Sequence, residues 1–216
     1  MKIGIFVPLH ITAIQDVYMA NCQSRFIERC SREFDVVSAM TIDHDATSKF
    51  DSINEISCAL IDMRSADGYG IVQPTLAALD FMSIHKPDII LRITQDTQVI
   101  DFDSFVELIN ISSDGLVGGY DECDNIGNYL QEIDIVQEDK NYRFVQGNFV
   151  LASVNLWEYY KKIPVSVKHY CDDSLFSYVV EHETGNSPIF VGRWDEQKIW
   201  RHNRTRNIYY LESLFR

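Results

Sequence analysis

The sequence contains no pair of cysteines with Cys-x-x-Cys spacing, although it has five cysteines. Scattered cysteines in odd number indicate reduced thiols, and therefore a cytosol-like compartment. No apolar stretch approaches the length of a membrane span, and residues 1–8 turn polar too quickly for a secretory signal. We therefore expect a cytoplasmic protein without a transmembrane segment.

Basic residues are scarce, since 19 Lys and Arg stand against 32 Asp and Glu, for a formal net charge of −13. This balance argues against a nucleic-acid partner, because phosphate backbones are bound by clustered Lys and Arg. Residues 193–206 are the exception, with Arg, Lys and His202 concentrated there. This segment is suited to one anionic ligand such as a diphosphate, or to a C-terminal strap that pairs with acids. The composition alone favours the strap.

Internal repeats, low-complexity tracts and Pro/Ser-rich linkers are also absent, which favours a single domain over residues 1–216. Helical patterns of apolar residues separate most of the strand-like runs. This alternation predicts an α/β fold with a mostly parallel, doubly wound sheet flanked by helices. The strand-like runs lie at residues 3–8, 34–42, 57–63, 88–93, 115–119 and 144–152.

Polar or glycine-bearing segments follow the first four predicted strands, at residues 7–10, 41–45, 64–70 and 94–97. In a parallel sheet these segments gather at the carboxyl edge, where open α/β folds bind ligands. Gly68 and Gly70 allow close backbone approach before a helix N-terminus, which favours an anion. Asp43 is placed to accept hydrogen bonds from a base or ribose, and Asp96 to reach a cation that holds a diphosphate. Each feature alone is equally explained as a turn, a loop cap or a solvated strand end.

The order of these segments resembles the motif order of the GT-A glycosyltransferases, especially the small family-two type. The matching segments are residues 5–10, 42–48, 66–70, 89–96, 146–151 and 171–175. The resemblance implies a Rossmann-like GT-A fold, with a nucleotide-sugar-binding half at residues 1–100 and an acceptor half with a C-terminal strap at 101–216. It also implies that the donor is bound by Pro8, Leu9, His10, Asp43, Arg64, Asp67, Gly68, Gly70 and Gln95.

The metal motif departs from the family pattern, because Thr94-Gln95-Asp96 stands where the family has Asp-x-Asp. We expect Asp96 to bind Mn²⁺ or Mg²⁺, with help from the Thr94 hydroxyl and with His202 completing the shell. One carboxylate suffices when water and substrate phosphate supply other ligands. The literal Asp101-Phe102-Asp103 is the second candidate, although Asp103 is better interpreted as the N-cap of a following helix.

The acidic pair Asp172-Asp173 opens a predicted helix and supplies the candidate general base. We expect Asp173 to take the proton from the acceptor hydroxyl, with Asp172 as the alternate, because one of the two caps the helix. The resemblance implies transfer of a sugar from a nucleoside-diphosphate sugar, with UDP as the expected nucleotide, to a glycan or other hydroxyl acceptor. An inverting outcome is favoured, and a retaining one stays open.

Three other functions compete with sugar transfer. A nucleotidyltransferase needs a Gly-rich, Arg-containing loop after strand one, and residues 9–13 contain no glycine. A non-catalytic nucleotide-sugar-binding module with a degenerate metal site is supported by the loss of one Asp from the metal motif. A structural protein with a Rossmann-like sheet predicts no nucleotide binding.

Overall fold

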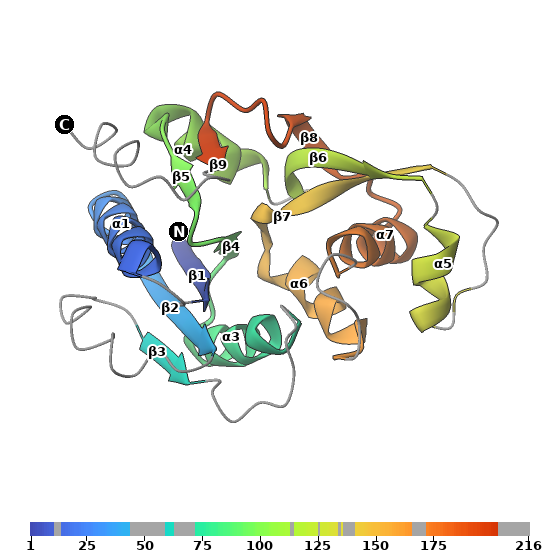
Figure 1. Ribbon diagram of the computed structural model, residues 1–216, viewed down its shortest axis with the longest axis horizontal. Coiled ribbons are helices and arrows are strands. Elements are labelled where there is room, and N and C mark those ends of the chain that lie inside the picture. The colour runs from blue at the N-terminus through green and yellow to red at the C-terminus, as the bar shows by residue number, and fades with distance from the viewer. Residues whose placement is uncertain are drawn as a thin grey trace.

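The computed structural model describes residues 1–10, 14–43, 59–62, 72–112, 115–124, 126–133, 135, 141–165 and 172–202. Its centre is a seven-stranded sheet with the order β3-β2-β1-β4-β7-β6-β8 (Figure 1). The strands are β1 (Lys2–His10), β2 (Asp35–Asp43), β3 (Ala59–Asp62), β4 (Ile89–Ile93), β6 (Val117–Cys123), β7 (Tyr142–Ser153) and β8 (Ile189–Arg193).

Strand direction confirms the expected mostly parallel sheet. Strands β3, β2, β1 and β4 are parallel neighbours, and β8 is parallel to β6. Strand β7 runs antiparallel to both β4 and β6. Because β1, β2 and β4 share one direction, their carboxyl ends lie at the same edge of the sheet. The sheet also joins the two halves of the sequence, since β4 pairs with β7.

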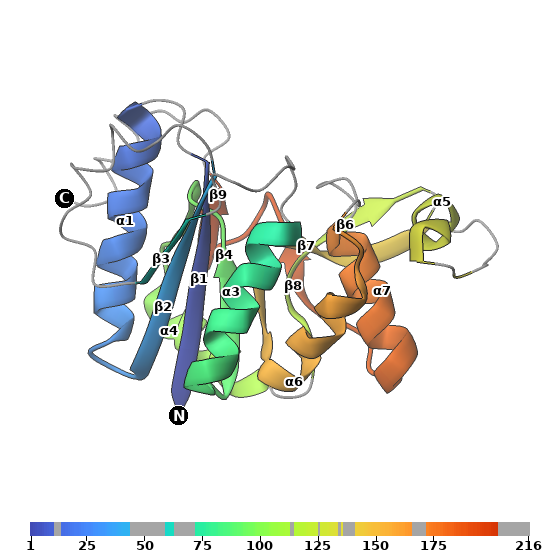
Figure 2. The ribbon, with the colours of Figure 1, turned by 90° about the horizontal axis from the view of Figure 1, so that it is seen from below.

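Helices cover both faces of the sheet (Figures 1 and 2). Helices α1 (Ile14–Cys30) and α4 (Phe102–Ile111) enclose one apolar core, and α3 (Val72–His85), α6 (Val154–Trp157) and α7 (Asp172–Thr184) enclose the other. All five residues of β4 are buried, as a central strand covered on two faces requires. Shorter turns are α5 (Gly127–Leu130) and the 3-10 segments Gln131–Ile133 and Glu158–Lys162. Within the described residues, no helix is long and apolar enough to cross a membrane.

Helix α4 is capped by Asp101, so the expectation that Asp103 caps it is wrong. The Oδ1 atom of Asp101 accepts from the Ser104 backbone N–H at 3.1 Å, and its Oδ2 accepts from the Ser104 hydroxyl at 2.7 Å. These hydrogen bonds hold the pKa of Asp101 below its ordinary value. Asp103 is the second residue of the helix, two positions after the N-cap, since Asp101 is the last extended residue.

A second, two-stranded sheet lies at the same edge as the carboxyl end of β4. It pairs β5 (Thr97–Val99) antiparallel with β9 (Trp200–His202), and neither strand is evident from the sequence. Trp200 is buried and its ring stacks on that of Phe149 in β7, with centroids 4.0 Å apart. The chain around residue 200 is therefore anchored in the core, more firmly than the surface strap that its composition suggests.

Candidate functional site

The turn after β4 is held from two sides. The Thr94 N–H donates to the Asn148 carbonyl at 3.0 Å, and the Thr97 N–H donates back to the Thr94 carbonyl at 3.0 Å. From α1, the side-chain amide of Gln23 donates to the carbonyls of Thr94 at 3.1 Å and Gln95 at 3.2 Å, and also to that of Thr97. The turn that carries Asp96 is thus fixed by the flanking helix and by β7.

Three side chains that the sequence predicts for the metal site meet at this turn, two from the turn itself and His202 from β9. The Thr94 hydroxyl donates to Asp96 Oδ1 at 2.8 Å, and His202 Nδ1 lies 3.5 Å from the same oxygen. Thr97 Oγ1 bridges them, at 2.9 Å from Thr94 Oγ1 and 3.1 Å from His202 Nδ1. The side chains of Asp96 and His202 are 20% and 19% exposed, so solvent reaches the pair.

The chemistry of this group fits a divalent cation bound mainly by substrate and water. A carboxylate is a ligand for Mg²⁺ and Mn²⁺, and an imidazole nitrogen favours Mn²⁺ of the two. Within the described ranges, no three His, Cys, Asp or Glu side chains come together to form a metal site. Asp96 and His202 would therefore hold the ion with the Thr94 hydroxyl, and phosphate oxygens would have to complete its shell.

The predicted donor-binding residues are only partly visible. Pro8 and Leu9 lie just before the end of β1 and pair with Thr41 and Ile42 of β2, with Pro8 half-buried and Leu9 buried. The backbone of His10 pairs with that of Asp43 at the same edge. These residues therefore lie at the carboxyl edge of the sheet, and their contact with a donor stays a prediction.

Gln95, another predicted donor contact, faces a different part of the protein. The side-chain amide of Gln95 is buried and donates to the Asp16 carboxylate of α1 at 3.3 Å. It therefore faces the helix. The remaining predictions lie outside the described residues; they are Arg64, Asp67, Gly68 and Gly70.

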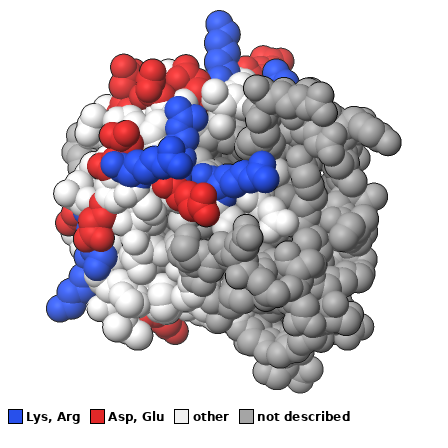
Figure 3. Space-filling model, turned by 90° about the vertical axis from the view of Figure 1, so that its left-hand side faces the viewer, with Lys and Arg blue, Asp and Glu red and all other residues white. Residues whose placement is uncertain are grey.

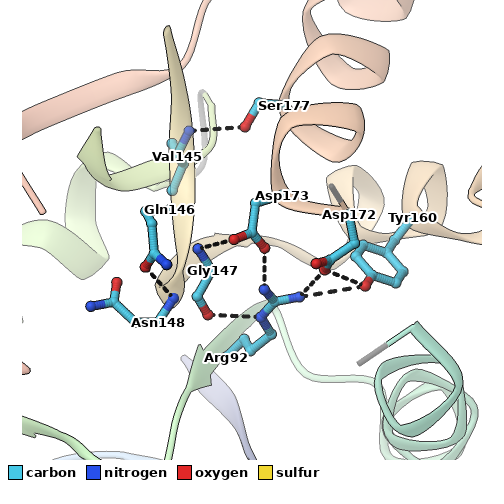
Figure 4. Close-up of polar contacts among 9 residues, drawn as sticks. All are labelled: Arg92, Val145, Gln146, Gly147, Asn148, Tyr160, Asp172, Asp173 and Ser177. Carbon is cyan, nitrogen blue, oxygen red and sulfur yellow. Dashed lines mark hydrogen bonds and ion pairs between the residues drawn. The ribbon is translucent and has the colours of Figure 1, made fainter. Parts of the chain in front are cut away.

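A buried arginine connects β4, β7 and α7 (Figure 4). The Nε atom of Arg92 donates to the Gly147 carbonyl at 2.9 Å, and Nη1 donates to Asp172 Oδ2 at 2.8 Å. Its Nη2 donates to Asp173 Oδ1, while the Gly147 N–H donates to Asp173 Oδ2 at 2.7 Å. This Arg92 cluster, composed of Arg92, Gly147, Asp172 and Asp173, fixes both candidate bases.

The two aspartates differ in what they can do. Asp172 is fully buried, and its Oδ2 also accepts from the Tyr160 hydroxyl at 2.6 Å. The side chain of Asp173 is 11% exposed. Burial and the Asp172 carboxylate raise the pKa of Asp173 to about 7, against the opposing effect of Arg92. A base with a pKa near neutrality suits proton transfer, so Asp173 is better placed than Asp172 for that role.

Asn148 is a candidate ligand contact that sequence reasoning missed. Its side chain is buried, points away from the Arg92 cluster (Figure 4), and forms no hydrogen bond through either amide atom within the part of the chain described. A buried amide group without partners costs about 1–3 kcal/mol for each unmet group. The backbone carbonyl of Asn148 accepts from the Thr94 N–H, so the residue with this unpaired side-chain amide lies next to the Asp96 turn.

Arg92 and Gly147 were also missed as site residues. The signal for Arg92 is a charge inside the apolar run of β4, which requires a buried acid as partner. Gly147 has a steric reason, because a Cβ at this position would overlap Arg92 Nη2 and Asp173 Oδ1. The resemblance places Gly147 in the matching segment 146–151, but the sequence gives no sign that this glycine contacts a buried arginine.

Solved structures with a similar fold include a mannosyltransferase and a cytidylyltransferase. A mannosyltransferase from Pyrobaculum calidifontis, solved with GDP-Man and Mn²⁺, has a TM-score of 0.58 at 12% identity, and the match covers 91% of this chain and 57% of that one. S. aureus TarS residues 1–349 give 0.54 at 13%, covering 94% and 60%. A cytidylyltransferase from Leptospira borgpetersenii gives 0.54 at 15%, covering 96% and 82%.

The TM-scores establish a shared fold, and the low identities leave the reaction open. No protein-family model matches the sequence, and no curated protein matches it. The chain spans 57% of the mannosyltransferase and 60% of the TarS fragment, so parts of those proteins have no counterpart here. The fold is the Rossmann-like α/β fold that glycosyl- and nucleotidyltransferases share.

Proposed function

We propose that this protein is a metal-dependent glycosyltransferase that moves a sugar from a nucleoside-diphosphate sugar, with UDP as the expected nucleotide, to an acceptor hydroxyl. The observation that carries the proposal is the meeting of Thr94, Asp96 and His202 at the carboxyl end of β4. Arg92, four positions before Asp96 on the chain, holds the candidate base Asp173. The shared fold with a mannosyltransferase that contains GDP-Man and Mn²⁺ supports this assignment.

The proposed mechanism assigns separate tasks to these residues. A bound cation would supply charge that neutralises the leaving diphosphate. Asp173 accepts the proton of the acceptor hydroxyl as that oxygen bonds to the anomeric carbon, and the electron pair of the broken bond leaves with the diphosphate. Attack from the face opposite the diphosphate makes the reaction inverting. Arg92 and the Gly147 N–H hold Asp173 in place, and Asp172 anchors the other side of the Arg92 guanidinium.

A pair of matched substitutions tests the proposal. Turnover of UDP-sugars, measured as UDP release with Mn²⁺, should fall by about 100-fold or more in Asp96→Asn. Asp101→Asn should keep wild-type turnover, because Asp101 only caps α4. Equal turnover in the two variants would contradict the assignment of Asp96. Saturable UDP-sugar binding without turnover on any acceptor tested would instead favour the non-catalytic binding module.

Nucleotidyl transfer is a second candidate, because the match covers more of the solved nucleotidyltransferases than of the mannosyltransferase. The match covers 82% of the Leptospira cytidylyltransferase, and 94% of a putative glucose-1-phosphate thymidylyltransferase from Bacillus anthracis with a TM-score of 0.51 at 14% identity. This reaction joins a sugar 1-phosphate to a nucleoside triphosphate and releases pyrophosphate. Pyrophosphate release from CTP, UTP or dTTP with glucose 1-phosphate, in the absence of sugar transfer, would replace the first proposal by this one.

A further inference from the structure

A cavity of about 190 Å³ lies between α1, β5 and the start of α4, away from the Arg92 cluster. Apolar side chains form much of its wall, with Phe26 from α1, Val99 from β5 and Phe102 from α4. A cavity of about 150 Å³ is large enough to hold a benzene ring. This cavity therefore has room for one aromatic ring with small substituents.

The buried part of the wall contains a hydrogen-bond donor without an acceptor. Gln98 lines the cavity and is 8% exposed, and its Nε2 has no partner in the described ranges of the chain. Leaving a buried N–H unmet is unfavourable, whereas a ligand oxygen in the cavity would satisfy it. The donor thus calls for a polar substituent on the buried side of the ring.

Positive charge borders the same cavity. Arg25 and Arg29 line it from successive turns of α1, and both are exposed. The guanidinium carbon of Arg29 lies 4.2 Å from the centroid of the Phe102 ring. Figure 3 views the molecule from the α1 side, where long basic side chains lie among acidic ones. A guanidinium binds a carboxylate through two parallel hydrogen bonds, so these arginines suit a carboxylate at the mouth.

We propose that this cavity binds a small aromatic carboxylate with a polar ring substituent. The ring packs against Phe26 and Phe102, the carboxylate pairs with the arginines, and the oxygen of the substituent accepts from Gln98 Nε2. A simple member of this class is 4-hydroxybenzoate. Gln23 lines the cavity and also supports the Asp96 turn, but no residue with a role in the proposed transfer chemistry lines it, so binding here can be tested without turnover.

Calorimetric titration of the whole chain, without donor or metal, tests the proposal. We expect saturable binding of 4-hydroxybenzoate, with weaker binding of benzoate, which lacks the oxygen for Gln98, and of 4-hydroxybenzamide, which lacks the charge. Arg29→Gln should weaken the binding of 4-hydroxybenzoate by about tenfold or more, because a hydrogen bond to a charged group is lost. Arg32→Gln removes the same charge from an exposed residue outside the cavity and should leave affinity unchanged.

A second variant isolates the buried donor. Gln98→Leu should reduce the affinity for 4-hydroxybenzoate to that for benzoate and leave benzoate binding unchanged. Absence of saturable binding to the wild-type chain at millimolar concentration would overturn the proposal, as would equal affinities for the three compounds. Equal weakening by Arg29→Gln and Arg32→Gln would also overturn it, since that result indicates non-specific charge attraction.

Discussion

At the scale of single residues, the protein interior contains a buried charge on Arg92 that is costly to desolvate. The residue is 2% exposed, so its guanidinium has lost its hydration. Two carboxylates and the Gly147 carbonyl replace the lost water. Such an arrangement is stable only as a set, because removing one member leaves the others charged and buried.

Substitution of Arg92 should therefore be costly. We expect Arg92→Met to lower the free energy of unfolding by about 3–5 kcal/mol, since Asp172 and Asp173 lose their buried cation. Arg143→Met is the matched control, because its ion pair with Glu122 is exposed on both sides and should contribute less than about 1 kcal/mol. Urea unfolding measures both values. Similar losses in the two variants would show that the Arg92 pairs are as weak as surface pairs.

The second residue-scale prediction concerns pH and Asp173. Its pKa is raised to about 7 by burial and by Asp172, so turnover should rise with pH through about 7 as the base loses its proton. The free energy of unfolding should change in the opposite sense, and fall as the pH rises. The unfolded side chain has a pKa of about 3.9, so the folded state binds the extra proton between that value and 7.

The stabilisation from Asp173 is thus complete below pH about 3.9 and is lost as the pH rises through about 7. Asp173→Asn should abolish turnover and remove this part of the pH dependence of unfolding. The checks are a pH profile of kcat/KM and urea unfolding at several pH values. A variant that retains turnover, or a wild-type profile that is flat near neutrality, would exclude Asp173 as the base.

At the scale of elements, an irregularity in β7 creates the site. Gly118 of β6 pairs with Val150, but Tyr120, two positions on, pairs with Val145, so β7 has extra residues between these pairs. Extra residues in one strand form a bulge, which redirects side chains locally. The bulge contains Gly147 and Asn148. The bulge brings Gly147 toward Arg92 and leaves Asn148 beside the Asp96 turn.

Gly147→Ala should disturb this element more than another glycine substitution. The added methyl would overlap Arg92 and Asp173, so we expect a loss of about 1–3 kcal/mol in unfolding free energy and a lower kcat. Gly115→Ala is the control, because its Cβ would meet no atom closer than 3.4 Å. It should change the unfolding free energy by less than about 0.5 kcal/mol. Equal effects would mean that the bulge accommodates a side chain.

The strands differ in how far the sequence predicts them. Strands β1, β2 and β4 are evident because a parallel strand buried on two faces needs a continuous apolar run. Strands β5 and β9 have three residues each and exist only because they pair with each other. The bulge in β7 is hidden for the same reason, since it depends on the register with β6.

At the scale of the whole molecule, the candidate site combines distant parts of the chain. Asp96 and Asp173 were identified through their order along a family pattern, and the structure places His202 with Asp96 as that pattern implies. The contact between Arg92 and Asp172 joins positions 80 residues apart, and no local pattern records such a pairing. The metal-binding and catalytic roles of these residues stay predictions.

Ligand binding should appear in the stability of the whole chain. If donor and metal share the site, UDP and Mn²⁺ together should raise the melting temperature. At a ligand concentration of 100 times the Kd, binding adds about 2.7 kcal/mol to the free energy of unfolding. His202→Ala should remove most of this shift, whereas His182→Ala, on α7 against Tyr178, should keep it. Differential scanning fluorimetry measures both. An undiminished shift in His202→Ala would exclude this histidine from the site.

The pairing of β5 with β9 also bears on synthesis. Thr97 and His202 are 105 positions apart, whereas the Arg92 cluster needs nothing beyond Asp173. During translation, every residue of the Arg92 cluster therefore leaves the ribosome before His202 does. The contact between Asp96 and His202 is then the later of the two to become possible.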